Sequence, residues 1–418
     1  MVGRSLQLVV SAVVVSMAIL WSRDVTRADD WPNWRGPHRN GISAETDWRW
    51  DRLEGGAKIL WRKSIGTGFA SVAVSGGRVY AFGNTGKSGD AKEAEQHDIL
   101  WCLDAGTGAE IWKHAYLSPL LPKNYEGGPN ATPTVEAGKV YTLSKHGHVF
   151  CVDAQNGAVV WQKHLGKDYG VEPPNWGLAG SPVIIGDLIV LNAGSYGTAL
   201  RKQDGGLAWG AQKGPAGYAS AVPYEQQGKS CAVILGHRGL YGVVAATGQV
   251  LWKQPWTTMH DENIPDQIVA GDKLFVCSGL GTGAALFRME PEKLIPVWSH
   301  KNLQNWLSSS VLWKGHVYGV DTGKTKGVVC LDFQTGDVKW SGPDVGTGSL
   351  MLADGKLIVL SDAGKLTIVE AVPTGYKELA SARILEGKCW TMPVLANGRI
   401  YARNAMGDFV CVDVSGVK

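Results

Sequence analysis

The chain has 418 residues, of which 44% are hydrophobic, so it is long enough to bury a large core. Its 55 glycines and 18 tryptophans are typical of many short strands joined by tight turns. The formal net charge of +3 is nearly neutral for this length, and no basic run that would neutralise phosphates occurs, so we expect no nucleic-acid partner.

Residues 1–28 have the pattern of a signal peptide. Arg4 supplies the positive end, Leu6 to Leu20 form an apolar stretch, and Thr26-Arg27-Ala28 places small residues where a signal peptidase reads them. The apolar stretch is short for a membrane span of about 20 residues. We therefore expect cleavage, export to the periplasm or the cell exterior, and no stable membrane span afterwards; an uncleaved anchor is the alternative.

Residues 29–54 form a leader that is too rich in proline and glycine for a helix. Trp31 and Trp34 would be costly to leave in water, so we expect the leader to pack against the rest of the protein and help close it. A role in ligand binding is the alternative. Arg35 is placed to pair with a carboxylate in either case.

The repeated unit is clearest at residues 101–112, which read hydrophobic-Asp-x-x-Thr-Gly-x-x-x-Trp. Asp104 has the side chain that bonds backbone amides two residues on, and Gly108 can take the positive φ of a tight turn. The chain then returns as a second strand carrying Trp112. A hairpin alone cannot bury a tryptophan, so the unit requires neighbouring copies.

The other copies give eight outer strands, with Leu379 at the eighth tryptophan position and two copies that lack the Asp. The last copy ends at the C-terminus before any tryptophan, whereas Ile59-Leu60-Trp61 has no preceding turn. We expect these two ends to pair and close a ring. We assign interblade packing to Trp61, Trp112, Trp161, Trp209, Trp252, Trp298 and Trp340, with turn residues Asp104, Gly108, Asp153, Gly157, Asp332 and Gly336.

Eight inner strands of the type Ser-Pro-Val agree with this count, and most are followed by a glycine turn and a second strand. Four strands per repeat of about 40–50 residues indicate a propeller blade. The prediction for residues 55–418 is an all-β, eight-bladed β-propeller of four-stranded antiparallel blades. The inner strands begin at Ser71, Thr132, Ser181, Ser220, Asp266, Ser309, Ser349 and Thr391.

These motifs resemble the tryptophan-docking repeat of the pyrroloquinoline-quinone-like (PQQ-like) β-propellers. That superfamily includes quinoprotein alcohol dehydrogenases and the propeller lipoprotein of the outer-membrane assembly machine. The Trp-Pro-x-Trp-Arg-Gly-Pro leader resembles one found in exported bacterial members. The resemblance implies the fold over residues 55–418. It does not decide function, because the motif holds the blades together in members with and without the quinone.

Four of the seven cysteines occupy one repeat position, and we interpret them as small buried core residues. Equivalent positions in adjacent blades are too far apart for a disulfide. No cysteine follows the apolar stretch of the signal segment, so the acylated cysteine of the assembly lipoprotein is absent. The four are Cys102, Cys151, Cys330 and Cys411.

Candidate site residues lie just before the inner strands, because the loops entering these strands converge at one mouth of the channel. The segments are rich in aromatics, amides and carboxylates, which can hold a planar cofactor, a sugar or a peptide; sealing the channel is the alternative. Residues 260–263 concentrate polar groups, but consecutive side chains rarely converge on one metal ion. The candidates are Asn130, Trp176, Tyr218, His260, Glu262, Asn305, Trp306 and Trp390.

We assign no catalytic residue and no metal ligand, since no hydrolase, metalloprotease or nucleotide-binding motif occurs in a credible context. The leading hypothesis is an exported, non-catalytic binding or scaffolding propeller, with a small molecule or glycan at the channel mouth or a protein along a blade edge. The alternatives are a quinoprotein oxidoreductase using PQQ with calcium and a carbohydrate-binding protein. The quinoprotein hypothesis lacks the adjacent cysteine pair of those enzymes.

Overall fold

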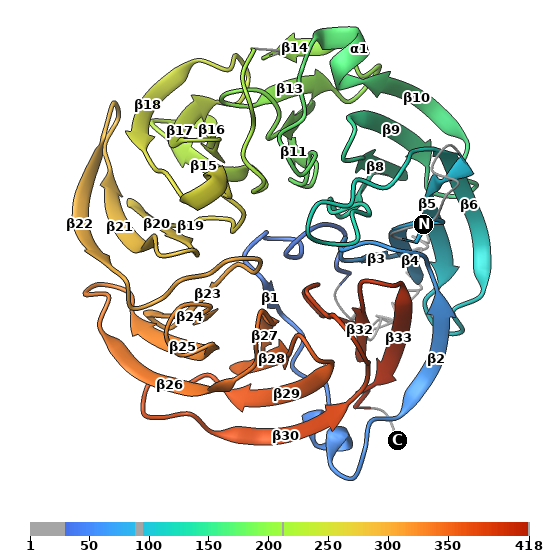
Figure 1. Cartoon of the computed structure of the whole chain (residues 1–418), viewed down its shortest axis with the longest axis vertical. Coiled ribbons are helices and arrows are strands. Elements are labelled where there is room, and N and C mark those ends of the chain that lie inside the picture. The colour runs from blue at the N-terminus through green and yellow to red at the C-terminus, as the bar shows by residue number, and fades with distance from the viewer. Residues whose placement is uncertain (1–29, 88–94, 211–212, 417–418) are drawn as a thin grey trace, which may run out of the picture.

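The computed structural model describes residues 30–87, 95–210 and 213–416, and the predicted signal segment lies outside them. Eight sheets surround a central channel, as predicted (Figure 1). Each is an antiparallel meander of four strands, and one sheet carries a fifth strand in parallel. The helices whose full bounds the structure describes are short: η1 (Trp50–Leu53), α1 (Leu165–Tyr169) and η3 (Met259–Asp261).

The first four blades run from the innermost strand outward in chain order. They are β3 (Ala73–Ser75), β4 (Arg78–Asn84), β5 (His97–Asp104) and β6 (Glu110–Leu117); β7 (Thr134–Glu136), β8 (Lys139–Leu143), β9 (His148–Asp153) and β10 (Val159–His164); β11 (Val183–Ile185), β12 (Leu188–Leu191), β13 (Thr198–Arg201) and β14 (Leu207–Trp209); and β15 (Val222–Gln226), β16 (Lys229–Leu235), β17 (Gly239–Val244) and β18 (Val250–Pro255).

The last four blades follow the same order, except that the outermost strand of the final blade comes from the N-terminal part of the chain. They are β19 (Ile268–Ala270), β20 (Lys273–Ser278), β21 (Gly283–Met289) and β22 (Leu294–His300); β23 (Val311–Trp313), β24 (His316–Val320), β25 (Gly327–Asp332) and β26 (Val338–Asp344); β27 (Ser349–Ala353), β28 (Lys356–Leu360), β29 (Lys365–Glu370) and β30 (Glu378–Arg383), with β1 (Ile42–Ser43) beside β27; and β31 (Val394–Ala396), β32 (Arg399–Arg403), β33 (Asp408–Asp413) and β2 (Ile59–Ser64).

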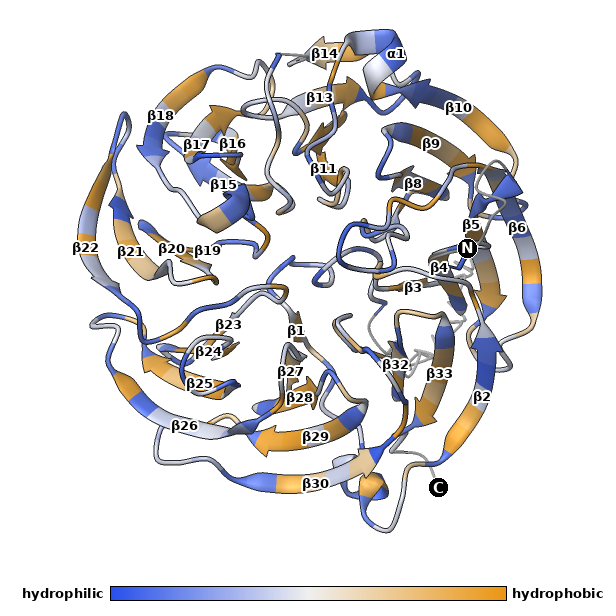
Figure 2. Ribbon diagram, in the orientation of Figure 1, coloured by the Kyte–Doolittle hydropathy of each residue, from blue (hydrophilic) through white to orange (hydrophobic). Residues whose placement is uncertain are grey.

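The middle strands are buried on both faces because each blade packs between two others. In β8 four of the five residues are buried, whereas the outermost strand β10 buries Trp161 between exposed neighbours. Figure 2 shows the same contrast, with mixed hydrophilic and hydrophobic stretches along the outermost strands. The strands therefore follow the burial pattern of stacked sheets.

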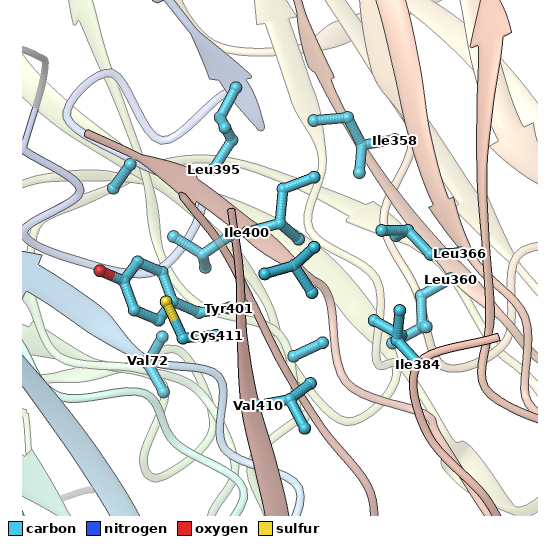
Figure 3. Packing of buried hydrophobic residues seen from close by; sticks show 14 of the residues in the cluster. Val72, Ile358, Leu360, Leu366, Ile384, Leu395, Ile400, Tyr401, Val410 and Cys411 are labelled. Atoms are coloured by element: carbon cyan, nitrogen blue, oxygen red, sulfur yellow. The ribbon is translucent and has the colours of Figure 1, made fainter. Parts of the chain in front are cut away.

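The ring closes by pairing the two ends of the chain. Strand β2 lies antiparallel to β33, and Trp61 is opposite Cys411. The largest apolar cluster spans this closure: Ile400 of the last blade lies on the side of Ile358 in the blade before it, whereas Cys411 lies beside Tyr401 and Val72, toward the first blade (Figure 3). A closed ring leaves no unpaired sheet edge between the first and last blades.

Each docking tryptophan lies against the turn of the following blade. A Cβ atom added to Gly157 would lie 2.6 Å from Cε3 of Trp112, so only glycine leaves room for the indole. The indole Nε1 of Trp112 donates to the carbonyl of Ala154 at 3.1 Å. The same donation joins Trp61 to Ala105, Trp161 to Lys202, Trp209 to Ala245, Trp298 to Phe333 and Trp340 to Val372.

Trp252 is the exception among these tryptophans. It is only 2% exposed, but its Nε1 has no hydrogen-bond partner among the described residues. The next turn, between β21 and β22, has no Asp-x-x-Thr-Gly segment to receive it. The degenerate repeat therefore lacks the interblade hydrogen bond that the other six docking tryptophans make.

The eighth tryptophan position was placed one residue too early. Ala380 lies opposite Ile368, in the register that Trp161 has opposite Cys151, whereas Leu379 is the extra residue of the bulge. Helix η1 packs against β30, and Leu53 joins the same apolar cluster as Ala380. The leader thus fills the space that a tryptophan side chain takes elsewhere.

The leader crosses the channel rather than following the outside of the ring, as the blue segment in Figure 1 shows. Trp31 exchanges two backbone hydrogen bonds with Val74, each 2.8 Å long. Pro32 accepts one from Val135. After the crossing, Ile42 pairs in parallel with Leu352. The leader therefore contacts inner strands on both sides of the channel and closes one end of it.

All seven cysteines are buried and unbonded. Burial raises the pKa of Cys102, Cys151 and Cys330 to about 11, so these thiols stay protonated at neutral pH. The four repeat-position cysteines pack in the blade cores, as predicted.

Candidate ligand-binding site at the channel mouth

A cavity of about 320 Å³ lies where the loops before the inner strands meet. Trp34 of the leader contributes to its wall, and the other lining residues come from all eight blades: seven contribute the loop before the inner strand, and the seventh blade contributes Ser349 and Leu350 of β27. Six of the eight predicted site residues line it: Asn130, Trp176, Tyr218, Glu262, Trp306 and Trp390. Their role in binding remains a prediction.

A belt of hydrogen bonds around the channel fixes the positions of the inner strands. At the start of each strand in this belt, the backbone N–H donates to the side chain of the next blade's equivalent residue. The donor–acceptor pairs are Ser71 to Thr132 at 3.1 Å, Thr132 to Ser181 at 2.9 Å, Ser181 to Ser220 at 3.0 Å, Ser220 to Asp266 at 2.7 Å and Asp266 to Ser309 at 2.9 Å.

The belt also supplies polar groups to the cavity. Ser181, Ser220 and Ser309 line it, and each accepts a backbone N–H through Oγ. A serine hydroxyl that accepts in this way still has its own proton to donate. Three hydroxyl donors are therefore available at fixed positions in the cavity wall.

Asp266 is the one carboxylate in this belt. Its Oδ2 accepts the indole N–H of Trp34 at 2.5 Å, and its Oδ1 accepts the backbone N–H of Ser220. Burial raises the pKa of Asp266, while the buried guanidinium of Arg35, 4.0 Å away, opposes that rise. Arg35 also donates to the carbonyl of Ser310 at 2.7 Å. The leader arginine thus pairs with a carboxylate, as its position suggested.

Seven aromatic side chains line the cavity: Trp34, Phe69, Tyr125, Trp176, Tyr218, Trp306 and Trp390. The rings of Phe69 and Trp390 are stacked with centroids 5.6 Å apart, and Tyr125 and Trp306 extend the row on either side. Trp176 and Tyr218 make a second contact with centroids 6.0 Å apart. The hydroxyl of Tyr125 donates to the carbonyl of Trp176 at 3.2 Å, which joins the two groups.

Glu262 is the cavity carboxylate without a cationic partner among the described residues. Its Oε2 accepts the indole N–H of Trp306 at 2.6 Å. Lys123, which also lines the cavity, donates to Asn175 at 2.9 Å. Lys388, whose ammonium lies 4.4 Å from the ring centroid of Trp390, pairs with Glu126 instead. The cavity therefore presents one carboxylate whose charge is not balanced by an ion pair.

Two predicted site residues lie elsewhere. Asn305 is fully buried, donates to the carbonyl of Val320 at 2.9 Å and accepts from the hydroxyl of Ser310 at 2.6 Å, so it holds strand β24 in place. His260 is exposed, with φ 61°, and does not line the cavity. Adjacent Asp261 bonds to Arg238, which lowers its pKa. Consecutive side chains here do point apart.

Phe69, Tyr125, Asp266 and Trp34 are among the lining residues that the predicted site list did not include. Phe69 and Tyr125 are aromatic residues in loops that precede inner strands, and this position in the sequence would have identified them as candidates. Asp266 replaces the serine of the inner-strand motif, which marked it as unusual. Nothing in the sequence placed Trp34 at the mouth, because this depends on the leader's path across the channel.

The lining does not suit PQQ with calcium. PQQ carries three carboxylates, whereas the charged groups of the lining are two carboxylates, Glu262 and Asp266, and one lysine, Lys123. Within the described residues no group of three or more His, Cys, Asp or Glu is arranged to hold a metal ion. A single lysine cannot balance three ligand carboxylates that lie beside two carboxylates of the cavity, so the lining does not suit a tricarboxylate such as PQQ.

Residues 96–342 match the family model described as outer membrane protein assembly factor BamB. The chain belongs to this family. No curated protein sequence matches it. Solved structures similar to this BamB-family chain include BamB from Moraxella catarrhalis, with 15% identity and a TM-score of 0.61 over 84% of this chain and 100% of that one.

The quinohemoprotein alcohol dehydrogenase from Comamonas testosteroni is also similar, with 12% identity and a TM-score of 0.62 over 93% of this chain and 81% of that one. The computationally designed Ika8 protein has 12% identity and a TM-score of 0.61 over 86% and 100% of the two chains. At these identities the likeness of the BamB-family chain to the solved structures shows the fold alone. Among the described residues, no helix is both long and apolar enough to span a membrane.

Proposed function

We propose that this protein is an exported, non-catalytic binding propeller that holds its ligand in the cavity at the channel mouth. The observation that carries the proposal is the convergence of aromatic rings and uncommitted polar groups on one cavity with a fixed wall. Trp306, Trp390 and Phe69 supply flat apolar faces, and Ser220 and Glu262 supply a donor and an acceptor. Such a combination is typical of small-molecule sites.

The rigidity of the wall supports binding. The hydrogen-bond belt ties six inner strands to one another before any ligand arrives. A ligand that enters a fixed site loses less affinity to ordering of the protein than one that must organise its site. Export is proposed from residues 1–28, whose composition is that of a signal peptide.

A second candidate function, docking of a protein along the blade edges, rests on a different observation. The residue before the docking tryptophan is apolar in several outer strands, and its side chain is exposed. Ile111 is 43% exposed, Val160 49% and Val297 46%. Exposed apolar residues on an edge strand favour contact with another chain.

The proposed function is tested by measuring the thermal stability of the full chain with a defined panel: maltose, choline, citrate, and PQQ with calcium. Trp306→Ala removes a cavity ring, and Trp313→Ala is the matched control, because Trp313 is the last residue of β23, the inner strand that follows the Trp306 loop, and does not line the cavity. We expect at least one compound to raise the Tm of the wild type and of Trp313→Ala but not of Trp306→Ala.

Two results of this measurement would contradict the proposal. If no compound raises the Tm of the wild type, or if each one that does acts equally on Trp306→Ala, the cavity is not the binding site. An increase with PQQ and calcium that depends on Trp306 would replace the proposal with the quinoprotein hypothesis.

A further inference from the structure

We infer that the mouth cavity takes an organic monocation, an alkylammonium group with attached apolar surface, whose charged head lies against Glu262. This inference rests on the proposed function, since it names the chemistry of the ligand in the same cavity. The first supporting observation is the charge of Glu262. Glu262 lines the cavity, and none of the ion pairs in the described residues involves it.

The other charged side chains that line the cavity have polar partners of their own. Asp266 has Arg35 at 4.0 Å and accepts the N–H groups of Trp34 and Ser220. Lys123 donates to an amide oxygen outside the cavity lining. Lys123 keeps its positive charge, because the oxygen of Asn175 is neutral, but no ion pair joins it to Glu262. Glu262 is therefore a cavity carboxylate with no cation at ion-pair distance among the described residues, and a ligand with a single positive charge can take that position.

The aromatic wall suits the same ligand. A cation gains electrostatic attraction from the face of a tryptophan or tyrosine ring within about 6 Å, and the gain grows when water is excluded. Trp306 is held in place by donating its indole N–H to Glu262 at 2.6 Å, so its ring and the carboxylate form one unit. The ring of Trp390 already attracts the ammonium of Lys388 at 4.4 Å.

A neutral sugar fits this arrangement less well. Its hydroxyls would satisfy the oxygens of Glu262 but would leave the charge unbalanced. Phe69, Tyr125, Trp306 and Trp390 form a continuous row rather than one flat platform. Methylated or alkylated ammonium heads present apolar surface in several directions, and a row of rings can contact them from more than one side.

The test is calorimetric titration of the full chain with choline and with 3,3-dimethylbutan-1-ol, which has the same shape without the charge. We expect choline to bind about tenfold more tightly than its neutral isostere. Glu262→Gln keeps an oxygen that can accept from Trp306 but removes the charge. It should weaken choline binding about tenfold and leave the isostere unchanged. Glu172→Gln, at an exposed loop position outside the lining, is the matched control and should keep wild-type affinity.

A second arm titrates Nα-acetyl-lysine methylamide. Binding tighter than that of choline would assign the cation to a peptide side chain, and weaker binding would assign it to a free amine; both agree with the inference. Equal affinity for choline and its isostere would overturn it without using any variant. So would unchanged choline affinity in Glu262→Gln. Binding of maltose that depends on Trp306, with no binding of choline, would overturn the cation inference alone. No Trp306-dependent binding of any panel compound would overturn the proposed function as well.

Discussion

The contact between Trp112 and Gly157 allows the docking of one blade on the next to be measured with a matched pair of substitutions. Gly157 and Gly138 lie in the same blade and have nearly the same backbone conformation, with φ of 75° and 73°. A Cβ added to Gly157 would lie 2.6 Å from Trp112, whereas a Cβ added to Gly138 would meet nothing within 4 Å. The two Gly→Ala variants therefore differ in the tryptophan contact.

The magnitudes follow from this difference. Placing alanine at positive φ costs about 1–2 kcal/mol at either position. Gly157→Ala must also displace the indole, and overpacking of a close contact costs about 1–3 kcal/mol more. We expect the free energy of unfolding to fall by about 1–2 kcal/mol in Gly138→Ala and by about 2–5 kcal/mol in Gly157→Ala.

Urea denaturation followed by circular dichroism measures both losses, and a third variant separates the steric part. In a Trp112→Ala background the indole is gone, so Gly157→Ala should cost no more than Gly138→Ala. Equal losses for the two glycine variants in the wild-type background would refute the docking argument. A Gly157→Ala cost that persists in full without Trp112 would refute it too.

Three further predictions concern other parts of the molecule. Trp112→Ala should lower the free energy of unfolding by about 3–5 kcal/mol, because it leaves a cavity in the blade contact. Trp390→Ala should lower it less, because that ring borders the open cavity. Urea denaturation measures both losses, and equal losses would contradict the placement of Trp390. Trp209→Phe should cost about 1 kcal/mol more than Trp252→Phe, because only the Trp209 indole makes a hydrogen bond; equal Tm values in the two variants would contradict this. Burial raises the pKa of Asp413, but hydrogen bonds to its carboxylate and two nearby cations lower it to about 2. The stability that the ionised carboxylate contributes is therefore present above pH 4 and is lost as the pH falls from 4 toward 2. The Tm of Asp413→Asn should lack that part of the pH dependence, and identical pH profiles would rule it out.

The repeat made the fold accessible from the sequence. A tryptophan and a glycine at fixed spacing can be satisfied only by stacking copies, and Trp61 without a preceding turn identified the closing strand. The eighth blade position was harder, because Leu379 and Ala380 have no tryptophan to fix the register. There the bulge decides which residue faces inward, and hydrophobicity alone favoured the larger leucine.

The sequence predicted where the candidate site lies better than it predicted which residues line it. Loop residues before inner strands must converge, so Trp176 and Trp306 were found from the order of the elements. Asn305, next to Trp306, is turned into the blade to bond backbone groups, and sequence order does not show the direction of a side chain. Trp34 and Asp266 come together only because the leader crosses the channel, a contact over 232 residues that no local pattern reveals.

The central claim is that ligand binds at the channel mouth and not along the blade edges. Its most direct test is a spectrum of the indole N–H groups of 15N-tryptophan-labelled protein, titrated with choline and assigned with single Trp→Phe variants. The chain has 18 tryptophans, which include Trp306 and Trp390 at the mouth and Trp112 and Trp161 at blade contacts. We predict that the signals of Trp306 and Trp390 shift and saturate together, while those of Trp112 and Trp161 stay unchanged. Shifts confined to the docking tryptophans, with the mouth signals unmoved, would contradict the claim.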